Sequence, residues 1–281
     1  MLSITSVLKE ATELLSDVSD SATLDAEVLL CVVLNKQRSH LRAWPDKILE
    51  HNQVKDFHVL LKQRQQGIPI AYITGKREFW SRDFLVTPDV LIPRPDTELL
   101  IELSLKLLTT DSEAKIIDLG TGSGIIAITL ATERPNTKIS AIDFSTSALD
   151  VAKKNAATHH IKTISFYQSD WFSNVPDSLF NLIISNPPYI AEHDAHLWQG
   201  DLRFEPLNAL CADEHGLKDI KIIAEKARNY LDANGHLLIE HGYDQSHQIQ
   251  TIFKNLNYTN VQTYNDLSGQ PRVTHGQWNL T

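Results

Sequence analysis

Three glycines occupy alternate positions in the stretch 118–124, DLGTGSG. This stretch lies between an apolar run at 115–119 and a helical pattern at 125–133, which is where a doubly wound sheet binds nucleotides. Glycine lets the backbone approach a ligand and adopt positive φ. The dinucleotide fingerprint would need a further glycine at position 125, which is Ile125, and the Gly-Lys-Ser/Thr of a phosphate-binding loop is absent. We therefore predict a turn that cradles a ligand without a pyrophosphate group.

An acidic residue lies at the end of the next predicted strand. Asp143 follows the apolar run 138–142 and comes a short distance after Gly120 in the chain. A carboxylate at this place can accept hydrogen bonds from both hydroxyls of a ribose. The glycine turn and Asp143 together predict an adenosine-type site. The simpler interpretation is a tight βα turn whose aspartate only caps a helix.

A second motif, Asn186-Pro187-Pro188-Tyr189, follows directly after the apolar strand pattern at 180–185. Two prolines remove two backbone donors and leave carbonyl oxygens free to accept hydrogen bonds. The Asn186 side-chain oxygen and the Pro187 carbonyl could accept both protons of a planar amino group, while Tyr189 stacks on its face. The motif predicts a pocket for an exocyclic amine of a base or for a side-chain amide. A plain turn with a surface tyrosine is the alternative.

Charge is unevenly distributed along the 281 residues. Residues 1–76 contain nine Lys/Arg and nine Asp/Glu, whereas residues 77–281 contain 17 and 26, so the formal net charge of −9 falls entirely on the second part. Duplex nucleic acid is usually bound by a basic face. The distribution therefore favours a protein or small-molecule substrate, and a protein partner would complement the acidic part with a basic surface.

Composition also limits the compartment and the kind of site. The longest apolar run, 28–34, is far shorter than a membrane span, and Lys9 and Glu10 interrupt the apolar core that a signal peptide needs. The cysteines Cys31 and Cys211 lie far apart in the chain and lack metal-ligand spacing. We expect a cytoplasmic protein with no membrane span, no disulfide framework and no metal site.

Hydrophobic periodicity predicts two regions. Helical patterns at 3–16, 25–34 and 45–66, the last opened by Pro45, indicate a small helical domain, and a turn-rich connector with a hairpin follows at 67–86. Strand patterns then alternate with helical ones, which indicates an α/β fold with a largely parallel sheet covered on both faces. The strands are expected at 115–119, 138–142, 163–166, 182–185 and 236–240, with a terminal antiparallel pair at 261–263 and 273–278, and the helices at 125–133, 147–157 and 217–231.

The two motifs resemble those of class I S-adenosylmethionine-dependent methyltransferases that act on planar nitrogen. The stretch 64–98, RQQGIPIAYITGKREFWSRDFLVTPDVLIPRPDTE, together with QSDWF at 168–172, resembles more specifically the bacterial peptide chain release factor glutamine methyltransferases. The resemblance covers essentially the whole chain. It implies a Rossmann-like, mostly parallel seven-stranded sheet at 96–281, a hairpin linker at 76–95 and an N-terminal all-α domain at 1–75 that docks the substrate.

The resemblance also implies roles for individual residues and partners. Asn186, Pro187 and Tyr189 would be catalytic, and with Pro188 they would hold the amide of the glutamine in the Gly-Gly-Gln motif of class I release factors. The cofactor would be S-adenosyl-L-methionine, and the protein would act as a monomer without binding nucleic acid. The residues expected to bind the cofactor are Gly120, Thr121, Gly122, Ser123, Gly124, Asp143, Trp171 and Asn186.

Other interpretations remain open at this level. One is methylation of an adenine amino group in DNA or RNA, which the acidic second part disfavours. Another is a dinucleotide oxidoreductase or an inactive adenosine-binding module. Arg94, between two prolines, borders the cofactor carboxylate or is a surface arginine, and Glu240 is a ligand-side or capping residue. The cluster 192–196, EHDAH, is more typical of a solvated loop than of a metal site.

Overall fold

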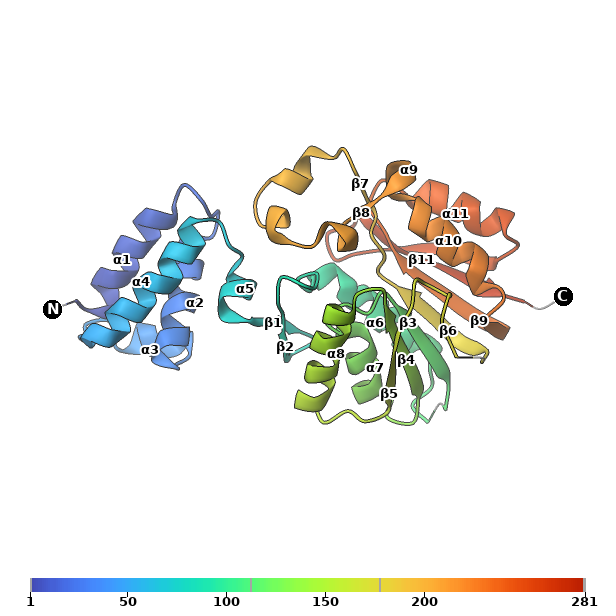
Figure 1. Ribbon diagram of the computed structural model, residues 1–281, viewed down its shortest axis with the longest axis horizontal. Coiled ribbons are helices and arrows are strands. Elements are labelled where there is room, and N and C mark those ends of the chain that lie inside the picture. Colours follow the sequence, from blue (N-terminus) through green and yellow to red (C-terminus); the bar gives the residue numbers. More distant parts are fainter. Residues whose placement is uncertain (1, 112, 177, 280–281) are drawn as a thin grey trace. The chain divides into compact units, whose positions relative to one another are not determined.

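The computed structural model describes residues 2–111, 113–176 and 178–279 (Figure 1). Its contacts divide the chain into two compact units. The helical unit comprises residues 1–76 and 195–204, and the sheet unit comprises residues 77–194 and 205–281. In the part of the chain that the structure describes, no helix combines the length and the apolar character that crossing a bilayer requires.

The helical unit packs short helices around a small apolar core. Residues Ile4, Val7, Ala11 and Leu15 recur on one face of the first helix and are all buried. Apolar residues at this spacing form a stripe along one side of a helix, so burial of the stripe holds the helix against its neighbours. The helices are α1 (Ile4–Leu15), α2 (Ala22–Leu34), α3 (Arg38–Ala43), α4 (His51–Gln65) and α5 (Ile70–Thr74).

The prediction that Pro45 opens the third helix was wrong. That region contains α3, then an irregular segment, and α4 begins only at His51, where the side chain and backbone of Glu50 form a reciprocal capping box with Gln53. The backbone amide of Thr5 donates to the Pro45 carbonyl at 3.0 Å. Amides in the first turn of a helix have no partner within the helix. The segment around Pro45 is therefore irregular because it caps α1.

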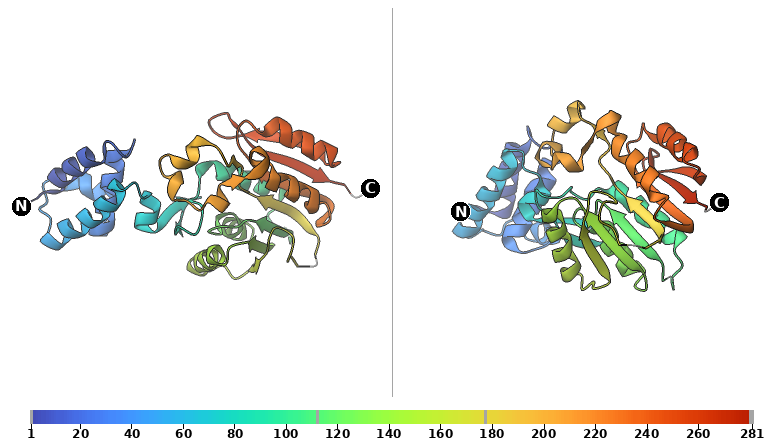
Figure 2. Two further views of the ribbon diagram at one scale, coloured as in Figure 1. Left: turned by 45° about the horizontal axis from the view of Figure 1, so that its top comes forward. Right: turned by 45° about the vertical axis from the view of Figure 1, so that its right-hand side comes forward.

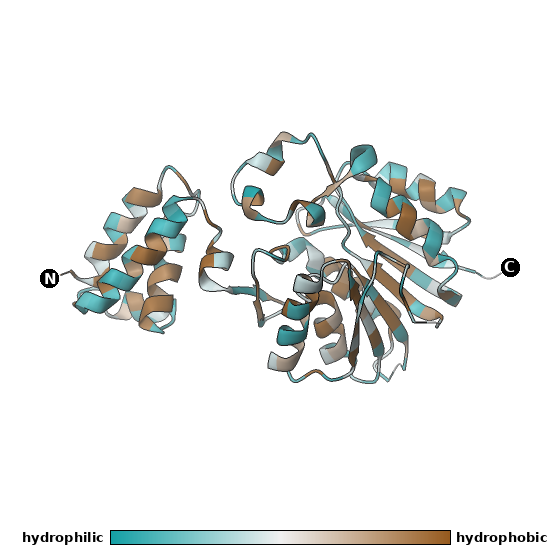
Figure 3. Cartoon of the chain, viewed as in Figure 1, coloured by the Kyte–Doolittle hydropathy of each residue, from teal (hydrophilic) through white to brown (hydrophobic). Residues whose placement is uncertain are grey.

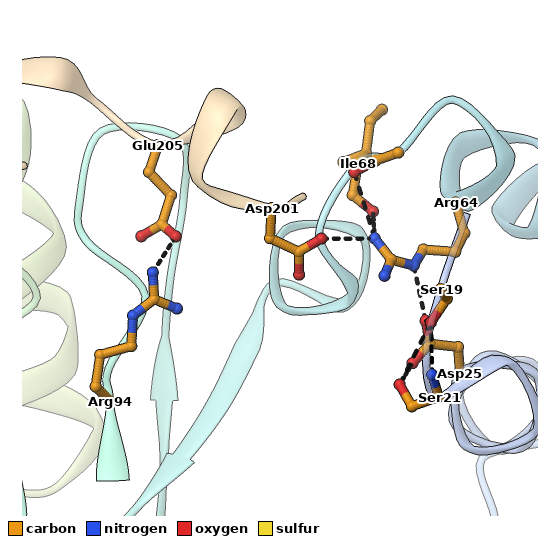
Figure 4. Close-up of polar contacts among 9 residues, drawn as sticks. Ser19, Ser21, Asp25, Arg64, Ile68, Arg94, Asp201 and Glu205 are labelled. Atoms are coloured by element: carbon orange, nitrogen blue, oxygen red, sulfur yellow. Dashed lines mark hydrogen bonds and ion pairs between the residues drawn. The ribbon is translucent and has the colours of Figure 1, made fainter. Parts of the chain in front are cut away.

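A buried arginine holds the segment Ala195–Phe204 in the helical unit (Figure 4). Arg64 Nε lies 2.7 Å from Asp25 Oδ2, and Arg64 Nη1 lies 2.9 Å from Asp201 Oδ1. The side chains of Arg64 and Asp25 are only 7% and 8% exposed. Ser19 and Ser21 also donate to the Asp25 carboxylate, at 2.7 and 3.0 Å. The segment Ala195–Phe204 is thus joined to the helical unit by an ion pair between the buried Arg64 and the partly exposed Asp201.

The sheet unit contains a seven-stranded sheet with strand order β10-β11-β9-β6-β3-β4-β5. Strand pairs β4–β5, β3–β4, β3–β6 and β6–β9 are parallel, whereas β11 is antiparallel to both β9 and β10. The strands of this sheet are β3 (Lys115–Leu119), β4 (Lys138–Asp143), β5 (Ile164–Gln168), β6 (Phe180–Ser185), β9 (Leu231–Glu240), β10 (Thr259–Asn265) and β11 (Pro271–Trp278). The predicted parallel sheet with a terminal antiparallel pair is confirmed.

Helices cover both faces of this sheet, and each face has its own apolar core (Figure 2). Ile116 belongs to one core and Ile117 to the other, because successive strand residues point to opposite faces. Both faces of the central strands are buried, so β3, β4 and β6 are mostly hydrophobic (Figure 3). One core includes α6 (Glu98–Leu107) and α7 (Ile125–Glu133), with α8 (Thr146–Thr158) beside them, and the other includes α10 (Lys218–Ala227) and α11 (Ser246–Asn255).

Short elements complete the two units. The predicted hairpin in the connector is confirmed as β1 and β2, and the sequence analysis missed the helices α3, α5, α6 and α11. The remaining elements are β1 (Lys76–Phe79), β2 (Arg82–Leu85), β7 (Ile190–Ala191), β8 (Cys211–Ala212), α9 (Asp213–Gly216) and the 3₁₀ turns η1 (Pro95–Thr97), η2 (Ala195–Trp198), η3 (Leu202–Phe204) and η4 (Leu207–Ala209).

Asn155, on α8, joins the hairpin to the glycine turn. Its side-chain oxygen accepts from the Leu85 amide at 2.7 Å, and its amide nitrogen donates to the carbonyls of Leu85 and Ser123 at 3.0 and 2.8 Å. Only 1% of Asn155 is exposed. A single buried side chain therefore fixes the position of the turn at residues 120–124 relative to β2 and α8.

We predict that Arg64→Leu loosens the helical unit because it leaves the Asp25 carboxylate buried without its counter-charge. Breaking a buried pair in this way destabilises by about 3 to 5 kcal/mol. Native-state hydrogen exchange should show faster exchange for the amides of α2 and α4. Arg38→Leu is the matched control, because Arg38 pairs with Glu27 while 45% of its own side chain is exposed. Equal effects of the two substitutions would contradict this assignment.

We predict that Asn155→Ala lowers the opening free energy of β3 and β4 amides by about 2 to 3 kcal/mol, because three backbone groups lose their buried partner. Native-state hydrogen exchange measures this quantity strand by strand. Asn255→Ala is the matched control, since Asn255 is exposed at the end of α11. Ordinary surface substitutions change stability by up to about 0.5 kcal/mol. If Asn155→Ala changes the opening free energy by less than this, the hydrogen bonds of Asn155 do not stabilise the turn.

Candidate active site

A cavity of about 230 Å³ lies in the sheet unit where β3, β4 and β6 end. Ligands of α/β sheets bind outside the carboxyl ends of the strands, so this is the expected place for a site. The cavity brings together most of the residues that the sequence singled out and leaves out Gly124, Pro187 and Tyr189. The predicted residues that line it are Gly120, Thr121, Gly122, Ser123, Asp143, Trp171, Asn186 and Pro188.

The glycine turn has the backbone conformation that its sequence predicts. Gly120, Gly122 and Gly124 all have positive φ, at 73°, 55° and 83°. A Cβ on Gly124 would lie 2.9 Å from Ile128 Cδ1 and 3.1 Å from Ala152 Cβ. Gly124 therefore permits close packing of α7 on α8, whereas Gly120 and Gly122 present bare backbone to the cavity.

Asp143 is bound to this turn. Its Oδ2 accepts from the Gly122 amide at 2.8 Å, and its Oδ1 accepts from the Ser145 amide at 2.9 Å. Burial raises the pKa of Asp143, although these backbone hydrogen bonds oppose the shift. Asp143 thus holds the turn and the start of α8 together while its carboxylate borders the cavity, so the structure combines the capping interpretation with the ligand-side one.

A second carboxylate lies beneath the turn. Asp118 is fully buried, and its Oδ2 accepts from the Thr121 hydroxyl at 2.6 Å. Burial raises its pKa to about 7, against the opposing effect of the Thr121 hydrogen bond. Among the described residues nothing hydrogen-bonds its Oδ1 atom. Asp118 therefore supports Thr121 from below and does not itself reach the cavity.

Aromatic residues form one part of the wall. Trp171 has a positive φ of 47°, and its Nε1 donates to Asp219 Oδ1 at 3.1 Å. A Cβ on Gly120 would lie 3.5 Å from the Trp171 ring, so glycine there leaves the ring face close to the turn. Phe144, which the sequence analysis missed, also lines the cavity and is 68% exposed. Its position directly after Asp143, the last residue of β4, could have identified Phe144 as a residue of the site.

Another part of the wall comes from the segment before α6. Arg94 lines the cavity and forms an ion pair with Glu205, whose side chain is fully buried. Figure 4 shows the contact between Arg94 and Glu205. Glu205 Oε2 also accepts from the Ile92 amide at 2.9 Å. Glu205 therefore fixes this wall. The sequence analysis left Arg94 undecided and missed Glu205, which is distant from Arg94 in the chain and has no local pattern.

Only part of the Asn-Pro-Pro-Tyr motif borders the cavity. Asn186 and Pro188 line it, whereas Pro187 is buried. Asn186 Nδ2 donates to Thr97 Oγ1 at 3.2 Å, and within the described residues its Oδ1 makes no hydrogen bond. The side-chain oxygen of Asn186 is thus available to accept a hydrogen bond from a ligand, as the sequence predicts.

Tyr189, the last residue of the motif, does not line the cavity and packs against the core that contains α10 and α11. Its hydroxyl donates to Glu240 Oε1 at 3.4 Å, and its carbonyl accepts from Gln245 Nε2 at 2.9 Å. A Cβ on Gly216 would lie 2.0 Å from that carbonyl oxygen, so this close approach requires glycine. Burial, with the nearby Glu240 charge, raises the pKa of the Tyr189 hydroxyl.

Burial raises the pKa of Glu240 to about 7, while hydrogen bonding to Thr97 and the Arg272 charge oppose the shift. Glu240 ends β9 at the same sheet edge as Asn186 and does not line the cavity. The 192–196 cluster is divided, because residues 192–194 belong to the sheet unit and 195–196 to the helical unit. Within the described residues, no group of three or more His, Cys, Asp or Glu side chains has the arrangement of a metal site.

The geometry thus joins two kinds of recognition in one cavity. Bare backbone, a carboxylate and an aromatic ring suit a nucleoside-type ligand. The side-chain oxygen of Asn186, Oδ1, suits an amino or amide group beside that ligand. Such a cavity can hold two reactants next to each other. Proximity of this kind converts a bimolecular reaction into an effectively unimolecular one.

Comparisons with solved structures show the fold. A methyltransferase from Pyrococcus furiosus superposes with a TM-score of 0.55 at 14% identity, covering 80% of this chain and 98% of that one. A 16S rRNA N2 G1207 methyltransferase from T. thermophilus, solved with AdoMet and guanosine, superposes with a TM-score of 0.53 at 14% identity, covering 73% and 50%. The expected class I methyltransferase fold is confirmed.

Family models and curated relatives extend this result. The model described as Methyltransferase small domain matches residues 96–200, and the model described as PrmC N-terminal domain matches residues 6–75. Proteins called release factor glutamine methyltransferase are 49% identical in Vibrio cholerae, over 99% of this chain and 97% of the relative, and 45% identical in Escherichia coli, over 96% and 97%. Because such relatives match it over almost its whole length, the chain belongs to the release factor glutamine methyltransferase family.

Proposed function

We propose that this enzyme transfers a methyl group from S-adenosyl-L-methionine to the side-chain amide nitrogen of the glutamine in the Gly-Gly-Gln motif of class I release factors. The observation that carries the proposal is that the glycine turn and Asn186 line one cavity. The relatives named for glutamine methylation of release factors support the choice of substrate. The adenine of a nucleic acid remains the alternative substrate that the experiment below also tests.

The residues of the cavity fit the cofactor. Gly120 and Gly122 leave room for the methionine part against bare backbone, Asp143 borders the place of the ribose, and the Trp171 ring offers a flat apolar face for the adenine. Thr121 and Ser123 complete the turn around it, and Gly124 keeps the turn packed on α8. When bound, S-adenosyl-L-methionine supplies an electrophilic methyl group on a sulfonium.

The chain's own residues supply geometry. An amide nitrogen is a poor nucleophile because its lone pair is delocalised into the carbonyl. We propose that Asn186 Oδ1 and the Pro187 carbonyl accept hydrogen bonds from the two N–H groups of the substrate amide, and that Pro188 and Tyr189 define the plane of that amide. This orientation directs the nitrogen at the methyl group, an effect that can lower a barrier by several kcal/mol. Acceptors on the amide protons also raise electron density on nitrogen.

We propose that residues 1–75 dock the release factor. We also propose that the enzyme acts as a monomer in the cytoplasm. The match to the PrmC N-terminal domain model at residues 6–75 supports a defined role for this region. Residues 1–76 carry no formal net charge, in contrast to the acidic remainder. A basic surface on the release factor would therefore meet the sheet unit, not the helical one.

We predict that labelled S-adenosyl-L-methionine methylates the organism's release factors at the Gly-Gly-Gln glutamine, as peptide mass mapping would show. Asn186→Ala should slow this transfer by at least about a hundredfold, because the amide loses its oriented acceptor, while the thermal unfolding temperature changes little. Label in DNA or RNA and none in protein would refute the proposed substrate. Near-normal turnover of Asn186→Ala would refute the role of the motif.

We predict that Trp171→Ala weakens S-adenosyl-L-methionine binding by about 5- to 150-fold in calorimetry, because stacking of a base on an aromatic ring contributes about 1 to 3 kcal/mol. Trp171→Phe keeps a ring but loses the hydrogen bond to Asp219, so it should retain most of the affinity. Trp44→Ala is the matched control, since Trp44 is 60% exposed in the helical unit. Unchanged affinity in Trp171→Ala would place the adenine elsewhere.

A further inference from the structure

Glu240 is a buried carboxylate to which the proposed methyl transfer gives no role. It is the last residue of β9, it is fully buried, and among the described residues its Oε2 has no hydrogen-bond partner. Ser185 pairs with Ile239, so Asn186 and Glu240 are the next residues along two paired strands. Burying an incompletely bonded carboxylate destabilises a fold, and a leucine would avoid that penalty. The neighbours of Glu240 connect it to Asn186 of the Asn-Pro-Pro-Tyr motif.

Thr97 connects Asn186 to the neighbourhood of Glu240. Asn186 Nδ2 donates to Thr97 Oγ1 at 3.2 Å, and the Thr97 side chain is near enough to the Glu240 carboxylate to lower its pKa by hydrogen bonding, against the larger effect of burial. A hydroxyl has one proton to donate. If that proton is directed to Glu240, Thr97 Oγ1 can only accept, and Asn186 must present Nδ2 to it. The opposite orientation would place the Asn186 and Thr97 oxygens against each other without a proton between them.

The burial of Thr97 is a second, independent observation. Thr97 ends the 3₁₀ turn η1 and leads into α6 with helical φ and ψ of −64° and −18°, and its side chain makes no capping hydrogen bond. Only 1% of Thr97 is exposed. Because the hydroxyl is shielded from water and does not cap the helix, its bonding is confined to its buried polar neighbours.

We propose that Thr97 and Glu240 are positioning residues that hold the Asn186 side-chain amide with its oxygen toward the substrate amide. The inference rests on the proposed methyl transfer and deepens it. If the Asn186 amide were flipped so that its oxygen and nitrogen exchanged places, its own NH₂ group would face the NH₂ group of the glutamine, and two donors cannot bond each other. Fixing this one rotation therefore decides whether the pocket accepts an amide.

The experiment compares purified full-length variants in methyl transfer to the release factor. Thr97→Val removes the hydroxyl and keeps the shape, and we expect kcat to fall about ten- to hundred-fold, while the Kd for S-adenosyl-L-methionine and the KM for the release factor change less than about threefold. Thr97→Ser should restore most of kcat. Thr129→Val is the matched control, because Thr129 is fully buried on α7 and, within the described residues, its hydroxyl has no partner.

Glu240→Leu separates positioning from stability. We expect it to lower kcat as Thr97→Val does while the unfolding temperature stays the same or rises, because a buried unsatisfied carboxylate is removed. A lower unfolding temperature with unchanged kcat would show a structural role and overturn the proposal. Adding Thr97→Val to Asn186→Ala should slow transfer by less than about twofold more, since the two act through one group. A further tenfold loss would also overturn it.

Nuclear magnetic resonance tests the orientation without any turnover. The side-chain NH₂ of Asn186, assigned by its absence in Asn186→Ala, should be protected from hydrogen exchange in the unaltered chain and in Thr129→Val, and unprotected in Thr97→Val and Glu240→Leu. Equal protection in all four chains would overturn the proposal. If the unaltered chain methylates no release factor, the proposed function fails, while this measurement still decides how Asn186 is held.

Discussion

Parallel pairing of four strands in a single register is the constraint on which the site depends. Leu119 pairs with Ile142 on one side and with Ser185 on the other, and Ser185 pairs with Ile239. The next residue along each strand is therefore Gly120, Asp143, Asn186 or Glu240. A shift of one residue in any strand would turn its side chains to the other face. One row across the sheet thus places the glycine turn, Asp143, Asn186 and Glu240 at the same edge.

This dependence explains why the sheet is hydrophobic on both faces. The register is specified only if every residue of the strand has a required face, and here Ile116 and Ile117 each enter a separate core. Once the register is fixed, the positions of the four residues at the carboxyl edge, from Gly120 to Glu240, are largely determined. Short-range bonds complete this row, such as those from Gly122 and Ser145 to Asp143.

The sequence predicted those parts of the site that are local in the chain. The glycine turn and the Asn-Pro-Pro-Tyr motif are recognisable because the residue types and the preceding strands lie within a few positions of each other. Thr97, Glu205 and Glu240 were missed or left undecided, because their meaning depends on partners far away in the chain or on neighbouring strands. A pattern within one segment carries no information on such pairs.

The wrong helix start at Pro45 has the same origin. Proline favours the first turn of a helix, and the following residues continue a helical pattern. The alternative use of Pro45, as an acceptor for the amide of Thr5, depends on a contact between segments that are distant in the chain. Local propensity was overridden because α1 needed partners for its first amides.

Buried carboxylates also change how the charge of this chain must be understood. The formal charge of −9 counts Asp118, Glu205 and Glu240 among the acidic residues, yet all three are buried. Burial raises the pKa of Asp118 and Glu240 to about 7, so each carries on average only part of a charge at neutral pH, whereas Glu205 and its partner Arg94 already cancel in the formal sum. The surface is thus less acidic than the sequence indicates. Any attraction of a basic partner surface then depends on the exposed carboxylates, whereas the buried ones contribute to the geometry around the site.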